Sequence, residues 1–278
     1  MDIPLPDIGD VTTTKIDGVD IRVARSGKAD GIPVLLTSPW PESIYAFRGI
    51  LPALKLGHPV IAVDLPGFGR SESRADLMSP VGMGAFIVTL AAHFRIERMH
   101  AVGPDVGTLA LLFAATRKPA IFESLIVGSG AASTELAGRG LKDLIESPAG
   151  YFANLEGGDV AVKFATDSAA IKTPDAVLED YRLSSAGRRF EEATNFVRAY
   201  VRDLPRLKAL LPSIQTPVLI IAGRQDPVVP PTNGELLADL LPHRRYVLLE
   251  GGHLIWEDAA PAYASNVSEW INGGYRSV

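Results

Sequence analysis

Residues 103–107 read Gly-Pro-Asp-Val-Gly, which places an aspartate between two glycines where an apolar strand-like run gives way to an apolar helical stretch. A tight turn of this kind presents its central side chain as a nucleophile, and the flanking glycines leave room for the strained backbone. A carboxylate that attacks an acyl carbon forms an unstable anhydride, whereas attack on a saturated carbon forms an ester that water can cleave. Asp105 therefore favours the opening of an epoxide or the displacement of a halide over the hydrolysis of ordinary esters.

Two further residues stand where such a nucleophile needs partners. Asp226 follows the apolar run 217–223, and His253 follows the last strand-like run, 245–249. Both are expected on loops beyond strands, where a rigid sheet can direct several side chains at one point. The order nucleophile, acid and histidine along the chain is typical of α/β-hydrolases and predicts a catalytic triad.

The elements that position these residues alternate between strand and helix. Strand patterns occur at 11–16, 20–25, 32–37, 59–64, 99–102, 124–128, 217–223 and 245–249, and helical patterns at 44–54, 80–94 and 108–115. Short β-branched runs that alternate with amphipathic helices indicate a mainly parallel sheet covered on both faces.

The alternation breaks after residue 131, and the sequence then shows helical patterns without a convincing strand up to residue 212. We predict a helical cap at 132–212, inserted between two core segments at 1–131 and 213–278. A helical insertion between two strands is expected to lie over the strand ends, where open α/β sheets bind ligands.

Several motifs follow one another in a fixed order along nearly the whole chain. They are Pro39-Trp40-Pro41-Glu42-Ser43, Asp64-Leu65-Pro66-Gly67-Phe68-Gly69-Arg70-Ser71, the 103–107 turn, Gly223-Arg224-Gln225-Asp226 and Gly251-Gly252-His253. In this order they resemble the Asp-nucleophile branch of the α/β-hydrolase superfamily, which includes epoxide hydrolases and haloalkane or haloacetate dehalogenases. The resemblance implies an α/β-hydrolase fold, with a mostly parallel twisted sheet, helices on both faces and an inserted helical cap.

The resemblance also implies a role for each site residue. Asp105 attacks an electrophilic carbon and forms an alkyl-enzyme ester, which is then cleaved by a water that His253 deprotonates. Asp226 orients the imidazole and stabilises its charged form. The backbone N–H groups of Trp40 and Val106 are expected to hold the oxyanion.

The sequence departs from the family pattern at two positions. Ser38-Pro39 replaces the usual His-Gly of the oxyanion loop, and Val106 stands where related enzymes carry Trp or Arg. The loss of that anchor counts against both dehalogenase interpretations, although the indole of Trp40 offers a different donor. An epoxide is less affected, because cap tyrosines polarise its leaving oxygen. The candidates are Tyr151, Tyr181 and Tyr200.

We therefore expect a hydrolase that needs no cofactor or metal and that opens a small apolar epoxide. One alternative is dehalogenation through the same ester, and another is a non-hydrolytic biosynthetic enzyme of the same fold that uses Asp105 as a base. A ligand-binding protein on this scaffold is disfavoured because all three triad members are present. Fold-level analogy alone does not choose among these functions.

Composition limits the partners and the compartment. The 278-residue chain has a formal charge of −5 and no cysteine, which excludes disulfides, a thiolate nucleophile and Cys-ligated metal sites. A chain without a basic footprint is not expected to bind nucleic acid, and apolar stretches of about ten residues are too short to span a membrane. The acidic, proline-containing N-terminus does not resemble a secretory signal. We expect a cytoplasmic enzyme with a small-molecule substrate, and leave the oligomeric state open, with a homodimer among the alternatives.

Overall fold

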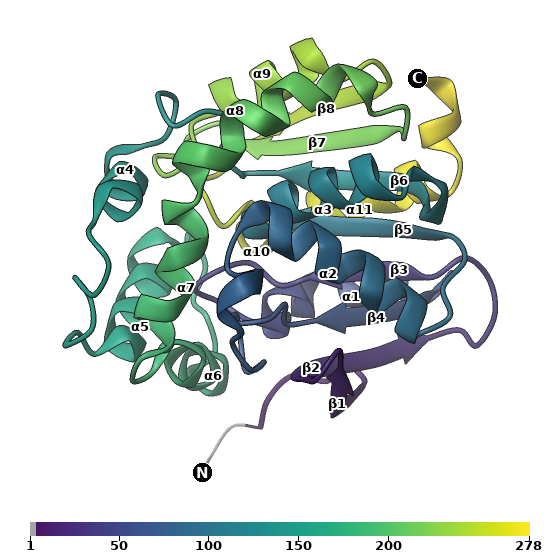
Figure 1. The fold of residues 1–278 in the computed structure, drawn as a ribbon. Helices are drawn as coiled ribbons and strands as arrows, with labels where there is room; N and C mark the ends of the chain where they lie inside the picture. The colour runs from purple at the N-terminus through teal and green to yellow at the C-terminus, as the bar shows by residue number, and fades with distance from the viewer. Residues whose placement is uncertain (1–3) are drawn as a thin grey trace.

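The computed structural model describes residues 4–278, which fold around one eight-stranded sheet with the strand order β1-β2-β4-β3-β5-β6-β7-β8 (Figure 1). The strands are β1 (Asp10–Ile16), β2 (Val19–Gly27), β3 (Val34–Thr37), β4 (Pro59–Val63), β5 (Met99–Pro104), β6 (Phe122–Gly128), β7 (Val218–Gly223) and β8 (Arg244–Leu249). β2 runs antiparallel to β1 and β4, and all other neighbours are parallel. The predicted mainly parallel α/β-hydrolase sheet is therefore confirmed.

Helices cover both faces of this sheet. One face packs against α1 (Leu51–Leu54), α10 (Ile255–Asp258) and α11 (Ala260–Ile271), and the other against α2 (Pro80–His93), α3 (Val106–Arg117) and α9 (Thr232–Leu240). The central strands β3, β5 and β7 are consequently buried at every residue. Burial on both faces explains why these strands read as continuous apolar runs rather than as alternating patterns.

The segment between β6 and β7 contains helices and turns and no strand. Its helices are α4 (Arg139–Glu146), α5 (Gly157–Ser168), α6 (Asp175–Ser185), α7 (Arg189–Arg198) and α8 (Tyr200–Leu210). Figure 1 shows α4 to α7 beyond the edge of the sheet at which the parallel strands end, while α8 lies over the face that carries α2 and α3. The division into a cap at 132–212 and two core segments at 1–131 and 213–278 remains a prediction.

The expected helix at residues 44–54 is instead a 3-10 turn, Ile44–Gly49, followed by the single turn α1. Pro52 explains the break, because it has no N–H to continue the hydrogen-bond ladder of a preceding helix. Ser43 begins the 3-10 turn by accepting a hydrogen bond from the backbone N–H of Tyr45. This short turn matters for the site, since it directly follows the loop that carries Trp40.

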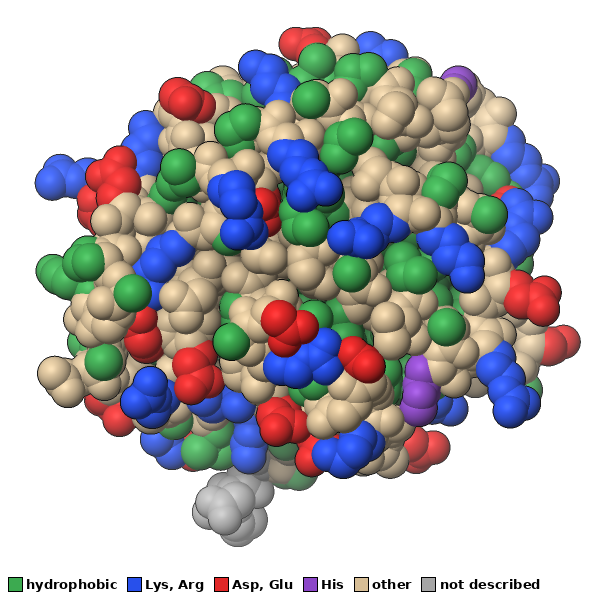
Figure 2. All heavy atoms as spheres, in the orientation of Figure 1, with side chains coloured by type: hydrophobic (Ala, Val, Ile, Leu, Met, Phe, Trp, Pro, Cys, Tyr) green, Lys and Arg blue, Asp and Glu red, His purple; other side chains and the backbone are tan. Residues whose placement is uncertain are grey.

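The surface carries charges of both signs. On the face shown in Figure 2, the Lys and Arg side chains stand apart, separated by apolar and uncharged groups, and Asp and Glu side chains lie among them. In residues 4–278, no helix combines the length and the apolar character that crossing a membrane requires.

Candidate active site

Asp105 occupies a strained turn between β5 and α3, with φ 53° and ψ −122°. A positive φ is uncommon for a residue with a side chain and costs about 1–3 kcal/mol, so the surrounding contacts must hold it. A Cβ added at Gly107 would lie 2.3 Å from Thr37 Oγ1, and one at Gly103 would lie 2.6 Å from the same atom. The two glycines therefore let the turn pack directly against the end of β3. This close packing presents the Asp105 carboxylate beyond the sheet.

The structure brings Asp105, Asp226 and His253 together from the ends of three strands. His253 Nδ1 lies 2.8 Å from Asp226 Oδ2, and His253 Nε2 lies 3.8 Å from Asp105 Oδ1. The other carboxylate oxygen of Asp226, Oδ1, accepts hydrogen bonds from the backbone N–H groups of Val228 and Val229 at 2.8 and 2.9 Å. These two bonds fix the Asp226 carboxylate, and the carboxylate in turn orients the imidazole toward Asp105.

Burial and charge act in opposite directions on the pKa values of Asp105 and His253. Burial raises the pKa of Asp105 above its ordinary value, although His253 and the backbone N–H groups of Trp40 and Val106 act in the opposite direction. Burial lowers the pKa of His253, but the charges of Asp226 and Asp105 outweigh it, and the net pKa is raised. A buried carboxylate and a buried imidazole thus stabilise each other's charged forms.

The expected oxyanion donors lie beside Asp105. The Trp40 N–H donates to Asp105 Oδ2 at 2.8 Å, and the peptide bond from Trp40 to Pro41 is cis. The N–H of Val106, the first residue of α3, also lowers the pKa of Asp105. One carboxylate oxygen is therefore held by the Trp40 backbone donor, while the other faces His253.

A cavity of about 250 Å³ lies against Asp105 and His253. Its wall is built largely by the inserted helices, with Leu141 from α4, Phe164 from α5 and Phe190 from α7. Neither Lys nor Arg is among the described residues that line it. An apolar wall without a cation suits a small uncharged ligand, because a charged group buried there would lose its hydration without a partner.

The three candidate tyrosines have different environments. Tyr200 lines the cavity, and burial together with the charge of Asp105 raises the pKa of its hydroxyl. Tyr181 does not line the cavity, because its hydroxyl donates to Glu257 Oε1 at 2.5 Å. Tyr151 is 68% exposed and packs against Phe152 on the surface. Of the three, only Tyr200 lies where it can meet a ligand beside Asp105.

Sequence reasoning missed the apolar side chains of the cavity and a buried polar cluster beneath the oxyanion loop. In that cluster, Glu42 accepts a hydrogen bond from Trp256 Nε1 at 3.4 Å, and Glu257 pairs with Arg48 at 2.6 Å. Burial, reinforced by the charge of Glu257, raises the pKa of Glu42 well above its usual range. The motif residue Glu42 could have drawn attention to this cluster, but no local pattern distinguishes a cavity-lining leucine from a core leucine.

Comparisons with known proteins place these features in a family. The sequence profile described as alpha/beta hydrolase fold matches residues 32–260. YugF, an uncharacterized hydrolase of Bacillus subtilis, is 23% identical over 271 residues, which cover 92% of this chain and 96% of YugF. A soluble epoxide hydrolase of Corynebacterium is 32% identical over 100 residues, which cover 36% of this chain and 34% of the relative.

The fold is also found in solved structures. The haloalkane dehalogenase DbeA of Bradyrhizobium elkani is similar with a TM-score of 0.82 and 20% identity, over 96% of this chain and 99% of that one. At this level of sequence identity, the similarity to DbeA shows a shared fold and nothing more. The profile match spans most of the chain and agrees with the sheet order and the helices on both faces. The chain belongs to the α/β-hydrolase fold family and is a hydrolase.

Proposed function

We propose that this hydrolase uses Asp105 as a nucleophile and opens a small, uncharged, apolar epoxide through an alkyl-enzyme ester. The main support is the geometry of the Asp105 carboxylate. Its Oδ2 accepts the Trp40 N–H at 2.8 Å, and its Oδ1 lies 3.8 Å from His253 Nε2, beside an apolar cavity that the phenol of Tyr200 also lines.

In the first step, Asp105 Oδ1 attacks an epoxide carbon, and the ring carbon–oxygen bond breaks. The electron pair of that bond moves to the epoxide oxygen, which takes the proton of the Tyr200 hydroxyl. Burial raises the pKa of Tyr200, and the charge on Asp105 raises it further. The second contribution disappears as Asp105 becomes a neutral ester, so Tyr200 becomes a better acid as the reaction needs its proton.

In the second step, water attacks the carbonyl carbon of the ester and gives a proton to His253. The carbonyl electron pair moves to the oxygen held by the backbone donors, which stabilise the resulting oxyanion. Collapse breaks the bond between the carbonyl carbon and the alkylated oxygen, and the departing diol takes the proton from His253. The proton left on the new Asp105 carboxyl returns to Tyr200. The sum is epoxide plus water to diol.

The cavity favours an epoxide over a halogenated acid, because no Lys or Arg among the described residues lines it to bind a substrate carboxylate. The similarity to a soluble epoxide hydrolase of Corynebacterium, at 32% identity over 100 residues, also supports an epoxide as the substrate. Dehalogenation of an uncharged haloalkane is the second candidate. One observation favours it: Trp40 Nε1 is buried without a hydrogen-bond partner in the described chain, and an indole N–H can donate to a halide.

The ester can be trapped by replacing His253 with Gln, which removes the base of the second step. We would incubate this variant with aryl and alkyl epoxides and haloalkanes that wild type converts, and measure the intact mass of the protein. A gain equal to the whole epoxide, located on Asp105, supports the proposal. A gain equal to the alkyl group without its halogen makes the enzyme a dehalogenase.

A variant that also carries Asp105→Asn serves as the control and should remain unmodified. If wild type turns over a substrate and the His253→Gln variant gives no adduct with it, Asp105 is not the nucleophile. In that case the enzyme uses Asp105 as a base and forms no covalent intermediate.

Replacing Tyr200 with Phe should slow ester formation from an epoxide by about 100-fold, because the developing alkoxide loses its proton donor. Ester hydrolysis should change little, since the phenol is not required to activate water. Rapid-quench mass spectrometry of single turnovers separates the two rates. Tyr151→Phe, which removes the same hydroxyl from the surface, is the matched control. Equal slowing of both steps would contradict the role assigned to Tyr200.

The two steps should respond differently to pH. Ester hydrolysis needs neutral His253. In the ester the charge of Asp105 is gone, and Asp226 still raises the pKa of His253 against the effect of burial, so this step is lost as falling pH protonates the imidazole. Ester formation needs ionised Asp105 and tolerates a protonated histidine. Burial raises the pKa of Asp105, but the charge of His253 lowers it, so we expect ester formation to continue to lower pH than ester hydrolysis. Wild type should therefore accumulate the ester near about pH 5.5 and not near about pH 8.5, as measured by mass after rapid quenching. Parallel loss of both steps would show that one group controls them.

A further inference from the structure

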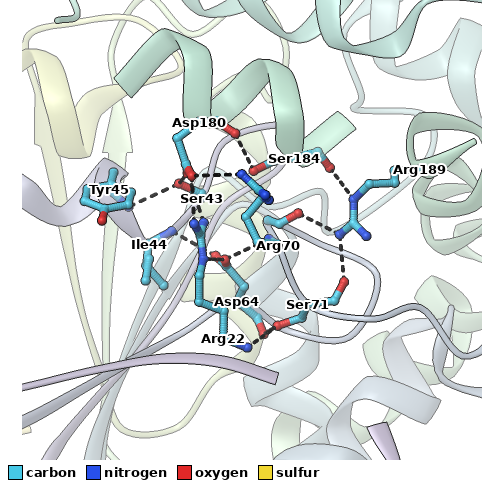
Figure 3. A network of polar contacts seen from close by, with 11 residues as sticks. Arg22, Ser43, Ile44, Tyr45, Asp64, Arg70, Ser71, Asp180, Ser184 and Arg189 are labelled. Carbon is cyan, nitrogen blue, oxygen red and sulfur yellow. Dashed lines mark hydrogen bonds and ion pairs between the residues drawn. The ribbon is translucent and has the colours of Figure 1, made fainter. Parts of the chain in front are cut away.

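A buried ionic cluster joins the inserted helices to the loops that form the site (Figure 3). Arg22 on β2 donates through Nε to Asp64 Oδ2 at 2.5 Å. Its two terminal nitrogens donate to the two oxygens of Asp180 on α6, at 2.7 and 2.9 Å. Both carboxylates are buried, and the Arg22 side chain is 11% exposed. One arginine therefore connects the sheet, the loop after β4 and the inserted helix α6.

The same two carboxylates hold the end of the oxyanion loop. Asp180 Oδ2 accepts a hydrogen bond from Ser43 Oγ at 2.6 Å, and Asp64 Oδ1 accepts the backbone N–H of Ile44 at 2.9 Å. Ser43 is three residues from Trp40, and all residues from 40 to 44 are buried. Such a short, packed segment transmits a shift at Ser43 to the N–H of Trp40, which donates to Asp105.

A second contact on the neighbouring helix strengthens the connection. Arg189, the first residue of α7, donates to the carbonyl oxygens of Gly69 and Ser71 at 2.6 and 2.7 Å. Ser71 in turn donates to the backbone oxygen of Asp64 at 2.6 Å. The inserted helices α6 and α7 are thus both bonded to the loops around Asp64, as Figure 3 shows.

We propose that Asp180 is a positioning residue that acts through Ser43, so that the Trp40 N–H is held in place by the seating of α6 on the core. The oxyanion donor and the cavity wall then form together, when the inserted helices are docked. The inference rests on the proposed function, because the donor matters through the ester intermediate.

The proposal predicts an effect on one step only. The oxyanion exists during ester hydrolysis, where the Trp40 N–H stabilises it. During ester formation, negative charge leaves Asp105, and a hydrogen bond to the carboxylate gives no advantage to the transition state. A misplaced donor therefore slows hydrolysis and leaves alkylation unchanged or slightly faster. A change that merely loosened the cavity would instead impair substrate binding and alkylation.

The test uses Ser43→Ala and Asp180→Asn in the full-length protein, with single-turnover rates of ester formation and decay measured by rapid-quench mass spectrometry. Ser43→Ala is the milder variant, since it removes the hydroxyl and leaves the pairing of Arg22 with Asp180. Each should slow ester hydrolysis about tenfold and keep ester formation within about twofold. The double variant should be no slower than the slower single variant, because both act through one contact. Glu179→Gln, on the exposed side of α6, is the matched control and should match wild type.

The possible outcomes separate this inference from the proposed function. An ester that decays at the wild-type rate in both variants overturns the role of Asp180 and leaves the proposed function intact. Equal slowing of formation and decay also overturns it, because that is the signature of a purely structural role. Failure of the His253→Gln protein to form any ester from a converted substrate overturns the proposed function, and with it this inference.

Discussion

Replacing Asp105 with Asn should lower kcat/KM by about 10⁴-fold or more without lowering the stability of the protein. Asparagine has the same shape, is tolerated at the positive φ of this turn, and its amide oxygen can still accept the Trp40 N–H. Its amide is not a nucleophile for a saturated carbon, so the first step is lost. The substrate should still bind, because the apolar cavity wall is unchanged.

The expectation that Asp105→Asn does not lower stability follows from the raised pKa of Asp105. A carboxyl whose pKa is higher in the folded than in the unfolded state favours folding when protonated, and disfavours it at neutral pH, where it is ionised. Asparagine removes this unfavourable charge, so the melting temperature should stay the same or rise. Asp143→Asn, an exposed change on α4, is the control for the substitution itself. Turnover and Tm are measured on the same preparation of each protein. If the Asp105→Asn variant retains turnover, the assignment of Asp105 as the nucleophile is wrong.

Asp226→Asn should lower the rate of ester hydrolysis by about 10³ to 10⁴-fold and leave ester formation largely intact. The cause is the tautomer of His253. The backbone N–H groups of Val228 and Val229 both require an oxygen at Oδ1, so the amide NH₂ of the asparagine must face His253. Nδ1 then becomes an acceptor, and the proton moves to Nε2, the nitrogen that has to accept a proton from water.

This prediction has a kinetic signature of its own. Because ester formation does not need a base, the Asp226→Asn variant should give a burst of about one ester per active site, followed by very slow turnover. The burst is measured by intact mass against time. Glu250→Gln, an exposed change in a neighbouring loop, is the control. A variant that loses the burst as well as turnover would show that Asp226 is needed to build the site rather than to orient the histidine.

Sequence reasoning reached furthest where the structural requirement is local. The glycines on either side of Asp105 indicate a tight backbone turn, because only small residues fit next to it. The whole pattern lies within five residues of sequence. The apolar runs indicate strands that are buried on both faces of the sheet. The order of Asp105, Asp226 and His253 along the chain predicts that they share one site. The predicted helix at 44–54 was less accurate, since the structure has a 3-10 turn followed by the single turn α1. The effect of Pro52 on a helix depends on the geometry of the preceding turn, which the sequence does not show.

The choice among the tyrosines required the tertiary structure. Tyr151, Tyr181 and Tyr200 all lie in helical or turn segments of the insertion, and nothing in the local sequence distinguishes an exposed ring, a ring bonded to Glu257 and a ring facing the cavity. The orientation of each ring depends on how its helix packs on the core. Packing of this kind sums many weak contacts from distant segments, and periodicity records only that a residue faces inward.

The amino-acid sequence by itself determined the order of strands and helices, the strained turn at Asp105 and the three residues of the candidate triad, because each depends on short-range backbone preferences or on motif order. Only the tertiary structure decided that Tyr200 meets the cavity and that Arg22 joins Asp64 to Asp180, a residue 158 positions away along the chain. A buried ion pair is stable only when both partners lose water together in one geometry. That condition is set by the folded molecule as a whole, and no local stretch of sequence contains it.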